Sequence, residues 1–473
     1  MVFLPDDLCA TILSRLPIKV FTSFKLVCKQ WNSVVDSPIF RELFIAQHQN
    51  THSSSWSLIM GAVDRTEFLA HYRCNTWGLQ RSLDSYISSF IAYKFENQRH
   101  YYRRGSVVAY SDAGFVLIDV SSYSYAGSTF EKRSLCVANP VSQECIEIDA
   151  PKAFENSGIF RPFGIATRTN NGVVTSYKIV AFSSESYVEN LGLMIYSSET
   201  GLWSRKLHLH SKSESCPHTI SLNGNLHWLS RNNDELVSMD FNATNMASGP
   251  FRYTDFPDLE KRVKFARACT TYQGSLMYIN IVSQDGSVDN KLCVWRLKSW
   301  EWQLISEIST ALTETKFDYI PLSINSCDAT TAYFLSQKHQ RLIAINLRNG
   351  ERMLHRELEL SSGGRILRSL HYSQGSYFYS FVLPQWLYRL PRQQRVADQI
   401  LRQDSDQLEV SFTSLLPLPG TGPVGGFTTL EPSSPGGDRR WCGPEGQPGN
   451  LGGTEAGGGG PSGQPGGMEP GGG

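Results

Sequence analysis

The sequence predicts an α+β multidomain chain: a small N-terminal helical domain, then an all-β propeller of about six blades, then a disordered Gly/Pro-rich tail. Three observations predict this order. Apolar residues recur at helical spacing in the first fifty positions. The long middle consists of short alternating runs broken by Gly, Asn, Asp and Ser. The end of the chain is too rich in Gly and Pro to bury a core. We place the three parts at residues 1–48, 53–391 and 392–473.

The first helix is predicted from its start and stop signals. Pro5 suits a first helical turn, and the acidic Asp6 and Asp7 favour the positive end of the helix dipole. Pro17 ends this helix. A second apolar stripe runs from Val20 to Val35, and we expect a third short helix from Ile39 to about Gln47. The apolar face of the first helix consists of Leu8, Ile12, Leu13 and Leu16.

A unit of roughly 40 residues seldom buries enough apolar surface to fold alone without a metal, a disulfide or a partner. Cys9 and Cys28 do not have the spacing of a zinc site. The excess apolar surface therefore requires another protein, or it packs as a plain helical hairpin on the next domain.

The motif positions of this stretch resemble an F-box. They are Leu4-Pro5, Asp7-Leu8, Ile12-Leu13, Leu16-Pro17, and Val27-Cys28-Lys29 with Trp31. The resemblance implies docking on a Skp-type adaptor and, through it, on a cullin. The residues expected to form the adaptor-binding surface and its supporting core are Leu4, Pro5, Leu8, Ile12, Leu13, Leu16, Pro17, Phe24, Val27, Cys28 and Trp31.

The middle of the chain repeats with a period near 50 residues. A glycine that leads into a strand recurs at Gly114, Gly224, Gly274 and Gly375, and we expect the missing copies near 165–180 and 325–335. A second phrase, strand–turn–strand, begins at positions 135, 194, 236, 292 and 342. Four short strands per period fit a kelch-like propeller blade. A large β-sandwich or barrel would explain the strands but not the period.

Phrases such as Val137-Ala-Asn-Pro140, Ile195 to Trp203 and Leu222 to Trp228 are similar to the F-box-associated region of plant F-box proteins. With the N-terminal motif, the likeness covers roughly Met1 to Pro391. True kelch repeats carry a Gly-Gly doublet that is absent here. Residues Thr51 to Gly105 match weakly and are interpreted as a first blade, or as a linker with an irregular blade.

Composition narrows the class of partner. Lys+Arg and Asp+Glu both number 44, so no nucleic-acid or anionic-membrane partner is expected. The ten cysteines are scattered singly, as in reduced thiols of an intracellular protein. The N-terminus has no secretion signal, and no apolar run approaches the ~18 residues of a membrane span. We expect a location in the cytoplasm, the nucleus or both.

We find no residues with the pattern of a catalytic, cofactor or metal site. Gly420 to Gly425 fits a dinucleotide-binding glycine pattern, but neither a strand nor a helix is expected around it. His208 and His210 share one face of a probable strand and lack a third metal ligand. His227 is interpreted as a packing or loop residue.

The resemblance therefore implies the substrate-recognition subunit of a Skp–cullin–F-box ubiquitin ligase, without catalytic groups of its own. The F-box would bind the adaptor and the propeller an unknown target, through loops such as 183–191, 231–235 or 284–290. The alternative is a stand-alone propeller that acts as a binding module or as an enzyme and carries a vestigial F-box.

Overall fold

The computed structural model describes residues 4–48, 56–62, 65–72, 76–96, 102–123, 130–151, 158–185, 191–209, 219–229, 235–241, 251–258, 268–283, 290–310, 319–326, 330–336, 341–353 and 377–391. All of them belong to one unit, Met1–Leu408. The tail predicted at 392–473 lies outside the described residues.

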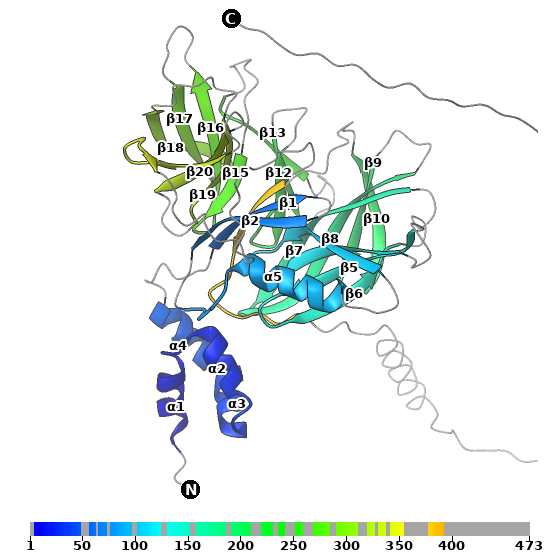
Figure 1. Ribbon diagram of the computed structural model, residues 1–473, viewed down its shortest axis with the longest axis vertical. Coiled ribbons are helices and arrows are strands. Elements are labelled where there is room, and N and C mark those ends of the chain that lie inside the picture. The colour runs from blue at the N-terminus through cyan, green and yellow to red at the C-terminus, as the bar shows by residue number, and fades with distance from the viewer. Residues whose placement is uncertain are drawn as a thin grey trace, which may run out of the picture. The chain divides into compact units, whose positions relative to one another are not determined.

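The N-terminal domain contains four short helices among its described residues (Figure 1): α1 (Asp6–Leu13), α2 (Ile18–Phe24), α3 (Lys29–Asp36) and α4 (Pro38–His48). The predicted second stripe is therefore two helices and not one. The break occurs because Cys28 is extended, with φ −159° and ψ 164°, and its Sγ accepts a hydrogen bond from the Trp31 amide at 3.5 Å. Cys28 is thus the N-cap of α3.

The described strands form six antiparallel sheets (Figure 1), as expected for about six blades. Five sheets have four strands each: β3 (Tyr102–Tyr110), β4 (Val116–Tyr123), β5 (Phe130–Asn139) and β6 (Glu144–Asp149); β7 (Gly158–Asn170), β8 (Val173–Glu185), β9 (Leu191–Ser197) and β10 (Leu202–Leu209); β11 (Thr219–Leu222), β12 (Asn225–Leu229), β13 (Glu235–Asp240) and β14 (Phe251–Asp255); β15 (Ala268–Tyr272), β16 (Ser275–Ser283), β17 (Asn290–Lys298) and β18 (Glu301–Thr310); β19 (Tyr319–Ile324), β20 (Thr331–Ser336), β21 (Arg341–Asn346) and β22 (Arg352–Met353).

The remaining sheet joins the two ends of the propeller. Its strands are β1 (Trp56–Ala62), β2 (Arg65–Tyr72) and β23 (Tyr377–Val382), with β1 in the middle. Trp56 pairs with Val382 and Gly61 with Tyr377. The weakly matching N-terminal segment therefore belongs to a blade that the last strand completes.

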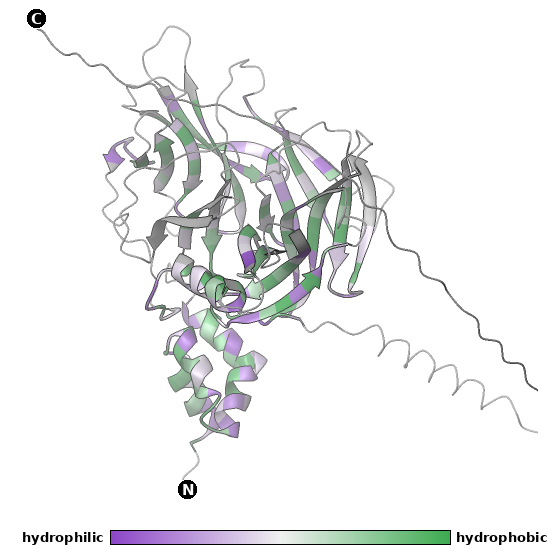
Figure 2. Ribbon diagram, turned by 45° about the vertical axis from the view of Figure 1, so that its right-hand side comes forward, coloured by the Kyte–Doolittle hydropathy of each residue, from purple (hydrophilic) through white to green (hydrophobic). Residues whose placement is uncertain are grey.

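Hydrophobic clusters between neighbouring sheets close the ring. Consecutive residues of one strand face opposite neighbours: Leu58 packs with Tyr333 of the β19–β22 sheet, whereas Ile59 packs with Ile118 of the β3–β6 sheet. Four further clusters fill the other spaces between adjacent sheets. Burial on both faces explains why these strands are apolar at successive positions, as Figure 2 shows.

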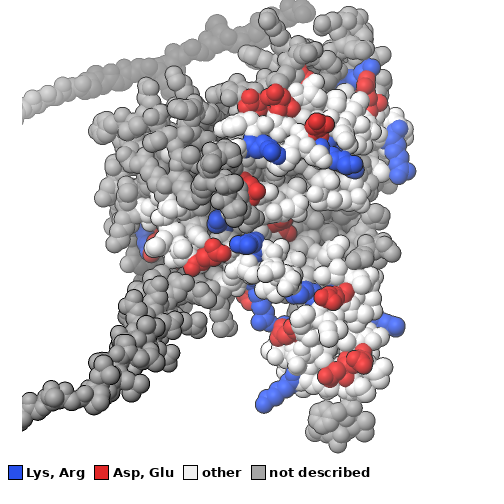
Figure 3. Space-filling model, turned by 180° about the vertical axis from the view of Figure 1, so that it is seen from behind, with Lys and Arg blue, Asp and Glu red and all other residues white. Residues whose placement is uncertain are grey.

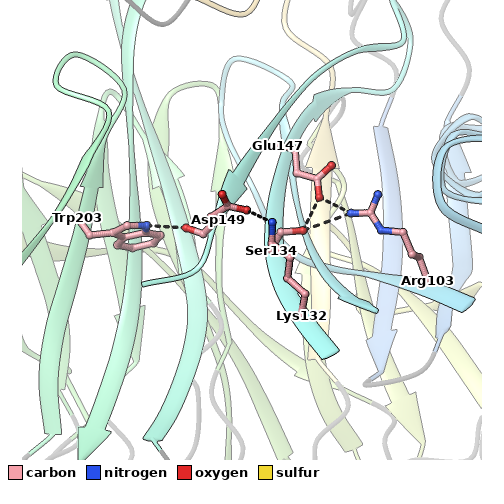
Figure 4. A network of polar contacts seen from close by, with 6 residues as sticks. All are labelled: Arg103, Lys132, Ser134, Glu147, Asp149 and Trp203. Atoms are coloured by element: carbon pink, nitrogen blue, oxygen red, sulfur yellow. Dashed lines mark hydrogen bonds and ion pairs between the residues drawn. The ribbon is translucent and has the colours of Figure 1, made fainter. Parts of the chain in front are cut away.

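Polar contacts within the β3–β6 sheet continue to the neighbouring blade through Trp203 (Figure 4). Glu147 accepts hydrogen bonds from Arg103 and, at 2.6 Å, from the Ser134 hydroxyl. Lys132 forms an ion pair with Asp149 at 2.6 Å, and the Asp149 carbonyl accepts a hydrogen bond from Trp203 Nε1 at 3.0 Å. Trp203 lies on β10, so its indole connects the β7–β10 sheet to β6.

Tight turns connect the first strand to the second in these sheets, as the glycine phrase predicts. Asn171 and Gly172 have φ values of 47° and 69°, almost the same as Asn223 and Gly224 at 53° and 78°. Asn171-Gly172 is thus the copy expected near 165–180. The region near 325–335 contains β20, while residues 327–329 of its turn lie outside the described residues.

A helix that the sequence reading missed follows β2. It comprises α5 (Leu83–Ile91) and a five-residue π-helix, η1 (Ala92–Glu96). Leu83, Ile87 and Phe95 are fully buried in the cluster that also contains Ile59 and Ile118. This helical segment therefore covers the cluster between the closing blade and the β3–β6 sheet.

Candidate partner-binding surface

The first helix presents an apolar surface to solvent. Leu8 and Ile12 lie one turn apart on α1 and are each 53% exposed, and Leu4, just before the helix, is 41% exposed. Pro5, the N-cap residue of α1, is exposed as well. Exposed aliphatic side chains at successive turns of one helix are suited to burial against a partner protein.

The turn between α2 and α3 adds a second apolar group. Val27 is 61% exposed, Cys28 is also exposed, and the neighbouring Leu26 is 91% exposed. Gln30 connects the two parts, because its Nε2 donates to the Leu4 carbonyl at 2.7 Å and to Asp6 Oδ1 at 2.8 Å. The start of α1 is thereby held beside α3.

The other predicted residues lie beneath this surface. Leu13 is 1% exposed in the core of the helical domain, and Leu16 packs against that core. Phe24 and Trp31 are half-buried with ring centroids 5.3 Å apart. Pro17 is half-buried and is the N-cap residue of α2. The structure thus separates six exposed residues from five supporting ones, which the sequence alone could not do.

Sequence reasoning missed three exposed apolar residues of the helical domain, of which Val20 is 37% exposed. Leu26 lies outside the matched motif, and Ile39, at the start of α4, is 77% exposed. A signal was available for Leu26, which lies out of helical phase with Val20, Phe24 and Val27. Lys/Arg and Asp/Glu side chains are interspersed on the face drawn in Figure 3, so this side carries no extended field of one sign.

Among the described propeller residues, the titratable groups that deviate from ordinary behaviour have structural explanations. His227 is buried on β12, where Nδ1 lies 2.8 Å from the Ser238 hydroxyl, and burial lowers its pKa to about 4. It is the packing residue expected. His208 lies on β10, whereas His210 lies outside the described residues. No group of three His, Cys, Asp or Glu side chains with the geometry of a metal site occurs in the described ranges.

Two cysteines form a pair on adjacent strands. Cys136 on β5 and Cys145 on β6 are diagonal neighbours, since Ala138 is the partner of Cys145 in the register. The hydrogen bond from Cys136, together with the Lys94 charge, lowers the pKa of Cys145 to about 6. Cys136 belongs to the buried cluster beneath α5, and the half-buried Cys145 packs against that cluster. No helix in the described part of the chain is long and apolar enough to cross a membrane.

Comparison with known proteins agrees with the motifs. Residues 3–43 match the F-box domain, and residues 54–392 match the family described as "F-box protein At3g26010-like, beta-propeller". F-box protein At3g28330 of Arabidopsis thaliana is 46% identical over 408 residues, which cover 83% of this chain and 96% of that protein. The putative F-box/kelch-repeat protein At1g15680 of the same plant is 30% identical, covering 82% and 95%.

Proposed function

The chain belongs to the F-box proteins that carry a β-propeller, and from that membership we propose that it is the substrate receptor of a Skp–cullin–F-box ubiquitin ligase. The exposed residues of α1 and of the α2–α3 turn bind the Skp-type adaptor, which connects the chain to the cullin. The propeller binds the target protein. The observation that carries this proposal is the apolar surface of Leu4, Leu8, Ile12 and Val27 at the matched F-box positions.

The chain's own contribution is proximity. A target held on the propeller has its lysines at a high local concentration near a ubiquitin-loaded enzyme carried elsewhere in the complex. This role requires no catalytic group in the chain. Cys9, Cys28, Cys136 and Cys145 form no disulfide, in keeping with a place in the reducing cytoplasm or nucleus.

The fold also favours one face of the propeller for the target. In an antiparallel sheet, the turns between strands one and two and between strands three and four lie at the same end. The helical domain contacts this end: Arg41 on α4 donates hydrogen bonds to the Asn171 and Gly172 carbonyls in the β7–β8 turn.

The connections between strands two and three leave from the other end. They include the predicted loops 183–191, 231–235 and 284–290, whose central residues lie outside the described ranges. We propose that the target binds at this end, because it faces away from the helices that bind the adaptor.

A binding experiment with exposed residues tests the adaptor surface. The double variant Leu8→Asp, Ile12→Asp should lower the affinity of the full-length chain for a purified Skp-type adaptor at least about a hundredfold, since two apolar contacts are lost and two carboxylates are buried. Leu202→Asp is the matched control, because Leu202 is 63% exposed on the propeller strand β10. Equal adaptor binding by the double variant and the control would contradict the proposal.

A further inference from the structure

The core of the helical domain is completed by a residue that follows the last strand of the propeller, Trp386. Trp386 lies against three phenylalanines of this domain, with ring centroids 5.6 Å from Phe21, 6.1 Å from Phe40 and 5.6 Å from Phe44. The three phenylalanines are at most 1% exposed and also contact one another edge-on or tilted. Without the indole, one side of this aromatic cluster would face solvent.

Trp386 is placed by the strand that closes the propeller. It follows β23 by four residues, and β23 pairs with β1. In the segment between β23 and Trp386, Leu383 is 1% exposed and the Pro384 carbonyl accepts a hydrogen bond from Trp77 Nε1 at 2.9 Å. The Tyr388 carbonyl accepts another from Asn139 Nδ2 at 3.1 Å. The segment 383–390, which we call the C-terminal strap, is therefore fixed on both sides of Trp386.

Other contacts link the helices to the propeller around this point. The Ile18 and Lys19 amides donate to the Thr76 and Trp77 carbonyls at 2.8 and 3.3 Å. Asp36 pairs with Lys25 of its own domain and, at 3.5 Å, with Arg389 of the strap. A pocket of about 290 Å³ remains beside Phe21 and Trp386. Truncation of the indole would enlarge this pocket and admit water to the phenylalanines.

We propose that Trp386 is a positioning residue that makes the adaptor-binding helices dependent on closure of the propeller ring. Trp386 does not touch the exposed surface of α1; it acts through Phe21, Phe40 and Phe44, on which α2 and α4 are packed. Only a chain whose β23 is paired with β1 holds Trp386 in place. Adaptor binding is thereby restricted to receptors with a completed target-binding domain. The last step rests on the proposed function, whereas the dependence of the helices on Trp386 does not.

Hydrogen–deuterium exchange of the full-length chain tests the structural step without an adaptor. Trp386→Ala should raise amide exchange in α2 and α4 at least about tenfold, because three ring contacts are lost. Exchange in the propeller strand β9 should stay unchanged. Trp386→Phe should restore most of the protection, and Trp300→Ala, at an exposed tryptophan of the β17–β18 turn, is the matched control. Equal protection of α2 and α4 in the Trp386→Ala and Trp300→Ala variants would overturn the inference.

Adaptor affinity, measured on the same variants, tests the coupling. We expect Trp386→Ala to weaken binding about tenfold or more and Trp386→Phe to recover it. Full affinity with unprotected helices would overturn the coupling step. If Trp386→Ala lowers protection in β9 as well, the strap supports the whole chain and the specific role of Trp386 is refuted. Absence of adaptor binding by the unaltered chain would refute the proposed function while the exchange result stands.

Discussion

Closure of the ring depends on Trp56, and its replacement gives a strong prediction. Trp56 is 1% exposed, stacks on Tyr333 with ring centroids 5.2 Å apart, and donates from Nε1 to the Ser380 hydroxyl at 2.6 Å. It thus joins β1 to β23 and to the neighbouring β19–β22 sheet. Trp56→Ala removes a large core side chain and should lower the free energy of unfolding by about 3–5 kcal/mol.

Urea denaturation followed by circular dichroism measures this effect. Trp300→Ala provides the control, since Trp300 is 42% exposed and its loss should cost less than about 1 kcal/mol. Trp56→Phe retains a ring against Tyr333 but leaves Ser380 without its indole donor, so an intermediate loss is expected. If Trp56→Ala unfolds at the same urea concentration as Trp300→Ala, the ring is not closed by this contact and the argument is wrong.

Two further predictions follow from perturbed pKa values. Burial lowers the pKa of His227 from 6.5 to about 4. As the pH drops from 6.5 through 4, the imidazole therefore takes up its proton in the unfolded chain before it does so in the folded chain, and the free energy of unfolding should fall by up to about 3 kcal/mol. The variant His227→Gln should flatten this part of the pH profile. The hydrogen bond from Cys136 lowers the pKa of Cys145 to about 6, so Cys145 is already mostly thiolate at pH 7. Iodoacetamide should therefore alkylate Cys145 at a nearly constant rate between pH 7 and 8, while the buried Cys136 stays unmodified. Mass spectrometry measures both thiols, and a rate for Cys145 that rises severalfold over this range would contradict the lowered pKa.

Local signals in the sequence were sufficient for the overall architecture. Pro5 is the N-cap residue of α1, as its place before Asp6 suggests, whereas α1 ends at Leu13, before Pro17, and Pro17 is instead the N-cap residue of α2. The glycine phrases marked turns whose positive φ values favour Gly or Asn. The copy expected near 165–180 was predicted without its turn residues, because the first aromatic residue after Gly172 is Tyr177, further from the glycine than in the other copies. The adaptor-surface residues were predicted as one set, and only coordinates could divide them into exposed and supporting ones.

The contacts that sequence reasoning could not find are long-range. The helix α5 has apolar residues at Leu83, Ile87 and Phe90, but it lies among β-like runs and was interpreted as part of an irregular blade. Nothing in the chain near Phe21 indicates that its ring partner is Trp386. Such pairs are selected by tertiary packing, to which local periodicity is blind.

The most direct test of the proposed receptor function is the affinity of the purified full-length chain for a purified Skp-type adaptor, measured by isothermal titration calorimetry. We expect a one-to-one complex with a dissociation constant below about 1 μM. Absence of binding at about 100 μM, in a preparation whose α2 and α4 amides are protected from exchange, would contradict the assignment of this chain as a ligase receptor.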